Sequence, residues 1–268
     1  MYYYAIVFII ILYIQAIMPN MHQKQNFDLF KDRYYAHRGL HANDSDAPEN
    51  SLKAFKLAVE AGYGIELDIR LTKDNIAIVF HDKTLKRSSG IDKTVRELNY
   101  EELKEFRLFN SDETIPLLED VLKLVNGKVP LIVEFKTYGK DLEICEIAAR
   151  ILDKYSGVYC IESFNPSIVN WYKKNRPEII RGQLSTNYFK DGIGDKSYLK
   201  FTLQNMLLNF YAKPDFIAFN HNYSNMFSYN IIRKFFKTPT FAYTVKSMEE
   251  LEKSRNSFDF FIFENFTP

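Results

Sequence analysis

The sequence predicts an α/β protein built as a closed (β/α)8 barrel, the TIM barrel fold. Short apolar segments alternate with amphipathic helical stretches from Arg33 to the C-terminus, a pattern typical of parallel β–α–β units. About eight such units fill residues 33–268, which agrees with the roughly 250 residues of a single barrel of this kind. Pro-rich or Ser-rich linkers are absent from this region, so we expect one domain over 33–268.

Each expected strand is a short apolar run, and the helices lie between the strands. The strands are expected at 34–37, 64–71, 131–136, 158–164, 179–184, 216–220, 241–245 and 260–264. The helices are expected at 51–61, 117–125, 142–155, 166–175, 198–211, 228–236 and 248–253. Asn50 is a candidate N-cap for the first of these helices.

Residues 76–81 break the alternation, because only a four-residue turn separates them from the second strand. Parallel neighbours need a long crossover, so this segment is expected to return antiparallel as a hairpin. A register that places Asp68 opposite Phe80 brings His81 down to the level of Glu66 and Asp68. Residues 83–115 then read as a small insertion after the second strand, containing one short helix at 100–106.

The first twenty residues stand apart from the barrel. Gln15 is the one strongly polar side chain between residues 2 and 18, and Pro19 ends the apolar run. A helix rises about 1.5 Å per residue, so this stretch with its flanks just reaches across a hydrocarbon core of about 30 Å. Residues 1–20 are therefore expected to form a single transmembrane helix that anchors the protein in a membrane.

Two other interpretations of this segment are weaker. A cleaved signal peptide has a basic start and a small-residue cleavage site, and a buried core helix has a polar face; residues 1–20 show none of these features. The basic residues Lys24, Lys31 and Arg33 follow the helix and none precedes it. The positive-inside rule then places the catalytic domain in the cytoplasm, by a thin margin.

Composition excludes several classes of protein. Lys and Arg number 35 against 34 Asp and Glu, so the excess positive charge expected of a general nucleic-acid binder is missing. A hydrophobic fraction of 46% excludes a disordered chain. Two cysteines, Cys145 and Cys160, are too few for a disulfide framework or a cysteine zinc site. The oligomeric state stays open.

Carboxylates are concentrated at the expected ends of the second and third barrel strands. Glu66 and Asp68 are two residues apart and so share one face of their strand, and Glu134 ends the next strand. If that face is the barrel interior, the three carboxylates converge and need a cation or a raised pKa. Hard oxygen ligands without cysteine favour Mg2+ or Ca2+ over zinc. The alternative is that these are separate exposed charges at strand ends.

Cationic and titratable groups accompany these acids. Arg38 offers a planar fork to phosphate oxygens, and Lys136 offers a point charge. His37 and His81 titrate near neutrality and can exchange the roles of acid and base, as phosphodiester cleavage requires. The other three histidines are expected to be structural: His22, His41 and His221.

Ordered motifs connect these residues with a known family. The motifs are AHRG at 36–39, PENS at 48–51, ELD at 66–68, LTKD at 71–74, VFHD at 79–82, IPLLE at 115–119 and EFK at 134–136. This ordered set resembles the glycerophosphodiester phosphodiesterases, whose barrel belongs to the phospholipase C-like phosphodiesterases. With its N-terminal helix the chain looks like a membrane-anchored bacterial member.

The resemblance implies roles for individual residues. Glu66, Asp68 and Glu134 would hold the divalent metal, and His37 and His81 would form the catalytic pair. Arg38 and Lys136 would bind the substrate phosphate.

Other positions are less firmly placed by the resemblance. Glu49 is expected to support the site from behind, with a plain loop or cap role as the alternative. Tyr243 stands where the family usually has Trp and is expected to keep an aromatic wall. Lys246 replaces the usual Asn, and the segment around Glu264 replaces the common Thr-Asp, which leaves the substrate's alcohol group in doubt.

The expected function is metal-dependent hydrolysis of glycerophosphodiesters to glycerol 3-phosphate and an alcohol, through a cyclic phosphate. A lysophospholipase D that cuts lysolipids, or a hydrolase of polyglycerolphosphate, remains an alternative, because an anchor would hold the domain beside a lipid surface. A non-catalytic phosphate- or lipid-binding module is disfavoured, because no expected catalytic residue is missing.

Overall fold

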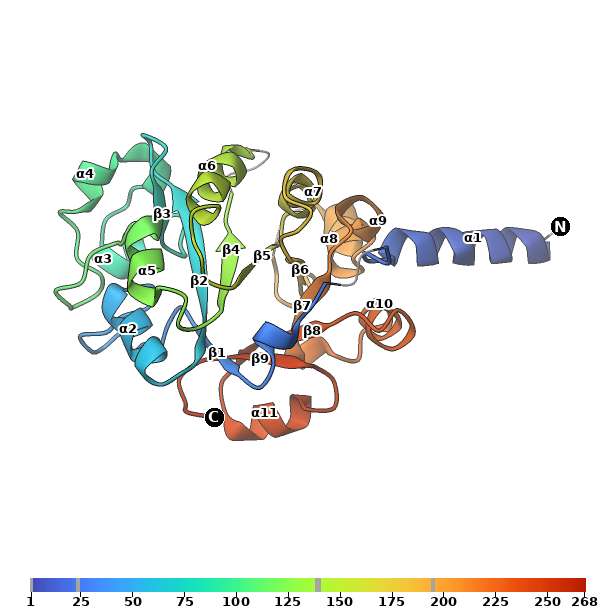
Figure 1. Cartoon of the computed structure of the whole chain (residues 1–268). Helices are drawn as coiled ribbons and strands as arrows, with labels where there is room; N and C mark the ends of the chain where they lie inside the picture. Colours follow the sequence, from blue (N-terminus) through green and yellow to red (C-terminus); the bar gives the residue numbers. More distant parts are fainter. Residues whose placement is uncertain (1, 23–24, 138–140, 194–195) are drawn as a thin grey trace.

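The computed structural model describes residues 2–22, 25–137, 141–193 and 196–268, and confirms the (β/α)8 barrel (Figure 1). Its eight parallel strands are β1 (Tyr34–His37), β2 (Gly64–Leu71), β4 (Leu131–Phe135), β5 (Tyr159–Ser163), β6 (Arg181–Ser185), β7 (Phe216–Asn220), β8 (Thr240–Val245) and β9 (Phe260–Phe263). Each strand pairs in parallel with the next barrel strand, and β1 pairs with both β2 and β9. These two pairings close the ring.

Helices cover the outside of the ring. They are α2 (Leu52–Glu60), α5 (Leu118–Val125), α6 (Glu143–Leu152), α7 (Pro166–Asn175), α8 (Ser197–Gln204), α9 (Asn209–Ala212), α10 (Phe227–Asn230) and α11 (Met248–Ser254), with the short turns η1 (Asp28–Phe30), η3 (His221–Tyr223) and η4 (Ile231–Phe235). The helix expected at 198–211 is two helices, because the chain turns at Met206, whose φ is +53°. The expected cap at Asn50 is also wrong: the hydroxyl of Ser51 accepts from the Ala54 amide and caps α2.

Aromatic rings fill part of the barrel interior. Phe241 stacks on Phe260 with centroids 4.4 Å apart and tilts against Phe216 at 4.8 Å. Gly182 is required beside this cluster, because a Cβ there would lie 2.2 Å from the Phe216 ring. Cys160 belongs to the same inner cluster, whereas Cys145 lies on α6 in the larger cluster between sheet and helices. Both cysteines are free and buried.

The hairpin has the predicted register. The short strand β3 (Ala77–Val79) runs antiparallel to β2 with Ile69 opposite Val79, and the Phe80 amide donates to the Asp68 carbonyl at 2.9 Å. The insertion that follows contains α3 (Lys86–Ser89), η2 (Val95–Glu97) and α4 (Tyr100–Leu103). The sequence predicted only one short helix there. The insertion has a small apolar core of its own next to the barrel.

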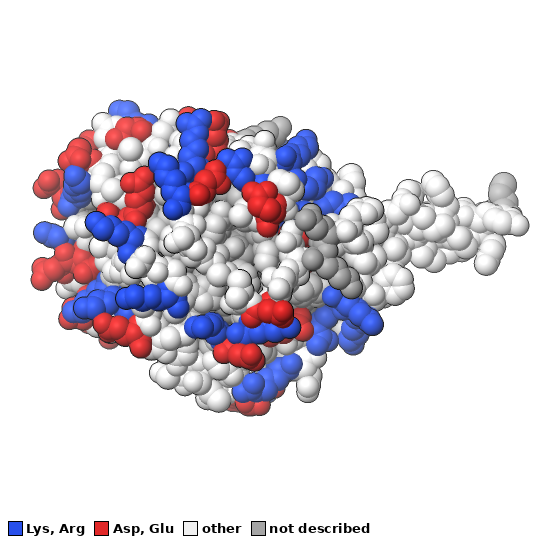
Figure 2. Space-filling view, viewed as in Figure 1, with Lys and Arg blue, Asp and Glu red and all other residues white. Residues whose placement is uncertain are grey.

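The N-terminal helix α1 (Tyr2–Ile17) projects away from the barrel (Figure 1) and carries no Lys, Arg, Asp or Glu (Figure 2). Its C-terminal end is fixed, because Ile17 is buried and its carbonyl accepts a hydrogen bond from Asn209 Nδ2 at 3.0 Å. Asn20 Nδ2 also donates to Asp215 at 2.7 Å.

The predicted transmembrane helix is not found. Among the described residues no helix is both long and apolar enough to cross a membrane. The 16 residues of α1 extend only about 24 Å at 1.5 Å per residue. Met1 and Lys24, used in the prediction of the anchor and its orientation, lie outside the described residues.

Candidate active site

Three carboxylates meet at the carboxyl ends of two neighbouring strands. Glu66 and Asp68 alternate onto the inner face of β2, and the parallel register places Asp68 beside Glu134 of β4. All three side chains are buried, and their oxygens lie within 4.8 Å of one another. The structure therefore brings together the acids that the sequence selected, and it excludes the alternative of separate exposed charges.

Two cations lie against this cluster. Lys136 Nζ is 3.1 Å from Asp68 Oδ1 and 2.7 Å from Glu134 Oε1, and Arg38 Nε is 3.2 Å from Asp68 Oδ2. Burial, joined by the charge of Asp68, raises the pKa of Glu66 well above its usual range. Burial also disfavours the charged form of Asp68, but Lys136 and nearby cationic groups outweigh it and hold that pKa well below its usual range.

This donor set fits a divalent cation. The cluster offers carboxylate oxygens alone, the ligands that Mg2+ and Ca2+ prefer. Asp68 Oδ1 is buried and accepts no hydrogen bond within the described residues; Lys136 is its ion-pair partner. Buried like charges at this spacing need additional positive charge to remain ionised together.

Glu49, expected to support the site from behind, is buried beside Arg38. It accepts from Arg38 at 2.8 Å and receives both terminal nitrogens of Arg87 at 2.7 Å. Burial opposes the charge on Glu49, but Arg87 and Arg38 prevail and lower its pKa to about 2. Sequence reasoning missed Arg87, which α3 of the insertion supplies, because nothing in the local pattern relates residue 87 to residue 49.

The two predicted catalytic histidines lie on different segments of the chain. His37 ends β1 with Nε2 3.8 Å from Glu66 Oε2. Burial and the neighbouring Arg38 lower its pKa to about 4. His81 follows the hairpin; its Nδ1 lies 2.6 Å from Asp82, and its carbonyl accepts from Arg70 Nε at 2.8 Å.

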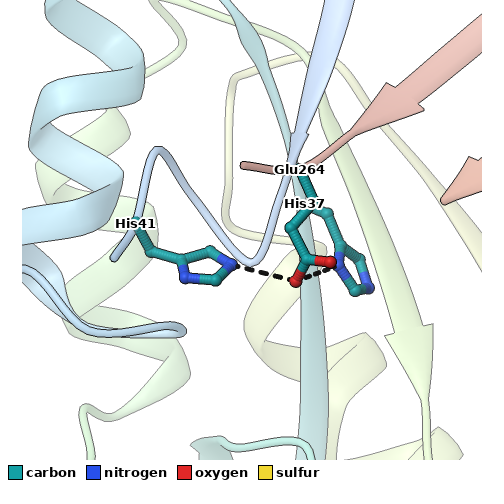
Figure 3. Close-up of side chains that lie close together, drawn as sticks. All are labelled: His37, His41 and Glu264. Carbon is teal, nitrogen blue, oxygen red and sulfur yellow. Dashed lines mark hydrogen bonds and ion pairs between the residues drawn. The ribbon is translucent and has the colours of Figure 1, made fainter. Parts of the chain in front are cut away.

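Two polar residues at the site had been assigned other roles. Asn50 Nδ2 donates to Asp68 Oδ2 at 2.9 Å, and its left-handed φ of +57° turns the chain so that it can do so. His41 lies 3.3 Å from Glu264, which also contacts His37, so it is part of the site's surroundings (Figure 3). The PENS motif gave a signal for Asn50, whereas no pattern in the sequence pointed to His41.

Tyr243, expected to form an aromatic wall, lies within β8 beside another aromatic ring. Its hydroxyl donates to the Ser185 carbonyl at 2.8 Å, and its ring meets Phe164 edge-on at 6.1 Å. Burial raises its pKa well above the usual range, so the hydroxyl stays neutral.

A cavity of about 580 Å³ extends from Glu134 toward α8. Glu134 and Lys136 line one side. The other side is mostly apolar, and its lining includes Phe164, Tyr188, Ile193, Leu199, Leu203 and Leu208.

The (β/α)8 barrel thus carries buried acids at the carboxyl ends of its strands, with the cations Arg38 and Lys136 in contact with them, an arrangement that suits a metal ion and an anionic substrate such as a phosphate ester. The chain belongs to the glycerophosphoryl diester phosphodiesterase family, whose model matches residues 37–231. This match includes every predicted site residue except Tyr243.

Individual curated proteins similar to this chain carry names that agree with this family. A glycerophosphodiester phosphodiesterase of Bacillus altitudinis is 39% identical over 111 residues, which are 39% of this chain and 44% of that protein. A lysophospholipase D of Rattus norvegicus is 32% identical over 129 residues, 43% of this chain and 40% of that protein. The chain thus spans about half or less of the length of these curated relatives.

Solved structures share the fold over most of their length. A phosphodiesterase of Oleispira antarctica, in complex with the product sn-glycerol-3-phosphate, superposes with a TM-score of 0.70 at 22% identity, over 87% of this chain and 93% of that one. The glycerophosphodiester phosphodiesterase of Thermotoga maritima gives a TM-score of 0.67 at 26% identity, over 86% and 94%.

Proposed function

We propose that this protein hydrolyses glycerophosphodiesters to glycerol 3-phosphate and an alcohol, with one divalent cation, Mg2+ or Ca2+, held by Glu66, Asp68 and Glu134. The observation that carries the proposal is the convergence of these buried carboxylates within 4.8 Å, with Arg38 and Lys136 in contact. Membership of the family and the product bound to one structural relative support the substrate class.

The phosphate is bound by the two cations of the site. Arg38 and Lys136 contact carboxylates at 2.7–3.2 Å in this structure, and both can turn toward phosphoryl oxygens entering beside those acids. A cation held by Glu66, Asp68 and Glu134 would supply positive charge that offsets the negative charge developing during phosphodiester cleavage.

The two histidines move protons. One of His37 and His81 takes the proton of the glycerol 2-hydroxyl, whose oxygen attacks phosphorus. The other donates a proton to the leaving alcohol as its bond to phosphorus breaks, and a cyclic 1,2-phosphate forms. The roles then reverse as water opens the ring. Attack within one molecule is favoured because effective molarities reach about 10⁵ M or more.

The test is an assay of the full-length chain on glycerophosphocholine, with Mg2+, with Ca2+ and with excess EDTA. We expect activity that EDTA abolishes and that His37→Ala and His81→Ala remove. Full activity in EDTA would contradict the metal. An analogue with hydrogen in place of the glycerol 2-hydroxyl should bind with almost no turnover; rapid turnover would eliminate the cyclic route alone.

A lysolipid substrate, cleaved by lysophospholipase D chemistry, is favoured over polyglycerolphosphate by one observation. The cavity beside Glu134 and Lys136 is lined toward α8 by aromatic and aliphatic side chains, which suit an acyl chain better than a polar polymer. Competition between lysophosphatidylcholine, glycerophosphocholine and polyglycerolphosphate distinguishes these substrates. The highest kcat/KM on lysophosphatidylcholine would support the lysolipid assignment.

We further propose that α1 attaches the protein to a lipid surface by lying against it, without crossing the membrane. Exposed apolar side chains surround the helix, and Tyr13 stacks on the exposed ring of Phe227 at 6.1 Å. The expected cytoplasmic orientation of the barrel stays a prediction. Flotation with phosphatidylcholine vesicles should carry the wild-type chain upward and leave an Ile6→Lys, Ile10→Lys variant behind; equal flotation of both would contradict the attachment.

A further inference from the structure

Glu264 follows strand β9 and lies between two histidines (Figure 3). Its Oε1 is 3.3 Å from His37 Nδ1 and 3.3 Å from His41 Nε2. Its other oxygen, Oε2, is 3.2 Å from Lys246 Nζ. The side chain is only 12% exposed, so water competes little for its contacts with the two histidines, whereas the Lys246 side chain is 58% exposed.

The carboxylate determines which ring nitrogen of His37 carries hydrogen. An ionised carboxylate accepts and cannot donate, so the neutral His37 ring directs its Nδ1–H at Glu264. The opposite nitrogen, Nε2, is then the free base, and it lies 3.8 Å from Glu66 Oε2 on the side of the carboxylate cluster. Hydrogen bonding at one ring nitrogen is how proteins select the tautomer of a histidine.

We propose that Glu264 is a positioning residue that fixes the ring and tautomer of His37, so that Nε2 is the atom that exchanges protons with the substrate. This inference rests on the proposed function, because it assigns an atom to a histidine proposed there as catalytic.

His41 and Lys246 hold the carboxylate in place. The side chain of His41 is 5% exposed, and Glu264 is its ion-pair partner. Lys246 engages the second oxygen, so rotation of the carboxylate would break a contact at each end. Two of the positions at which this chain differs from the usual family pattern, 246 and 264, are therefore joined by one ion pair.

The same three groups could also be considered as a second metal site, since His37, His41 and Glu264 offer ligand atoms within 4.8 Å. The ammonium group of Lys246 argues against it, because it already supplies positive charge to the carboxylate, and a second cation there would be repelled. A positioning role uses every contact that the structure shows.

The experiment combines kinetics with spectroscopy on the full-length chain. Glu264→Gln should lower kcat on glycerophosphocholine at least about tenfold with KM changed less than about threefold, because ring orientation affects the chemical step more than binding. Glu264→Asp, which keeps the charge, should recover part of that loss. Glu252→Gln, the same change at an exposed site on α11, is the matched control and should leave kcat unchanged.

Nitrogen-15 spectra of histidine-labelled protein test the tautomer even if a variant folds poorly, with His37→Gln identifying the signal. We expect neutral His37 to carry hydrogen on Nδ1 in the wild type. Hydrogen on Nε2, or wild-type kcat in Glu264→Gln, overturns the inference. Activity retained in His37→Ala would overturn the inference as well. If the wild-type chain does not cleave glycerophosphocholine, the proposed function has failed instead.

Discussion

The two halves of the barrel rim differ in chemistry. The half formed by β1, β2 and β4, with the inserted residues 83–115, is a network of buried ion pairs around three carboxylates. The half that continues from the end of β5 to α8 lines most of the cavity of about 580 Å³, largely with apolar side chains. Every motif that connects the chain with its family lies between residues 36 and 136, in the charged half.

This difference indicates a division of labour. Bond cleavage and phosphate binding are proposed for residues of the first half, which meet through strand register and one hairpin. In the proposed reaction the leaving alcohol extends toward the second half, whose apolar lining side chains lie on other segments than the three carboxylates. Selectivity and catalysis should therefore respond to different substitutions, and the following predictions examine that separation.

The largest effect is expected at Glu134, where the two halves meet. Glu134→Gln removes one of three converging charges, so kcat/KM should fall at least about 100-fold. The free energy of unfolding without metal should not fall, because repulsion between the carboxylates is relieved. Kinetics with thermal unfolding check both effects, and Glu146→Gln on α6 is the exposed control. Unchanged activity in Glu134→Gln would remove this carboxylate from the metal site.

A smaller effect, on stability, is expected where the insertion joins the charged half. Arg87→Gln removes two hydrogen bonds to Glu49 and one to Asp82, and should lower the free energy of unfolding by about 2 kcal/mol at pH 7.

The pH dependence of this loss has a definite sign. The native pKa of Glu49 is about 2, below its ordinary value, so the stabilisation is present above about pH 4.5 and is lost as the pH falls toward 2. Urea unfolding measured from pH 7 to pH 3 should show that the difference in free energy of unfolding between wild type and Arg87→Gln becomes smaller as the pH falls. Lys86→Gln is the control, because the ion pair of Lys86 with Asp92 is exposed and 3.8 Å long and should contribute little to stability. A difference that becomes larger in acid would contradict this account.

Next comes a change of selectivity in the apolar half. Leu199 on α8 is exposed and lines the cavity, so Leu199→Asp should leave the fold intact. We expect kcat/KM on lysophosphatidylcholine to fall about tenfold, with that on glycerophosphocholine within about twofold. Tyr198→Asp, exposed beside it but outside the lining, should alter neither. Equal losses on both substrates would show that the two halves are not separable.

The smallest effect is expected at Glu162, which β5 places beside Glu134. Burial, joined by the charge of Glu134, raises its pKa well above the usual range, so its side chain is held neutral. Glu162→Gln preserves a neutral polar side chain, and kcat/KM should stay within about threefold. A loss as large as that in Glu134→Gln would make Glu162 a fourth member of the cluster.

Period-2 alternation was enough to predict the carboxylate cluster from the sequence. It predicts that Glu66 and Asp68 share a face, and parallel pairing then places Glu134 next to them. The short turn after β2 likewise predicted the hairpin and the register that carries His81. These are local rules, and the structure follows them.

Side chains that arrive from distant loops were beyond such rules. Arg87 reaches Glu49 across 38 residues, and Glu264 reaches His37 across 227. The extent of α1 was overestimated: a helix over residues 1–20 was expected, whereas α1 ends at Ile17, just before Met18 and Pro19. Asn50 was read as a cap since the sequence does not reveal its left-handed backbone.

The two free cysteines give the molecule a pair of internal reporters of opening. Burial raises the pKa of Cys145 to about 12 and that of Cys160 well above its usual range, so neither offers a thiolate near neutral pH. Alkylation therefore requires local opening of the structure. Cys145 becomes accessible when the outer helices separate from the sheet, and Cys160 becomes accessible when the aromatic cluster inside the barrel opens. The order in which the two thiols are labelled would reveal whether the outer helices separate before the barrel opens, without any engineered probe.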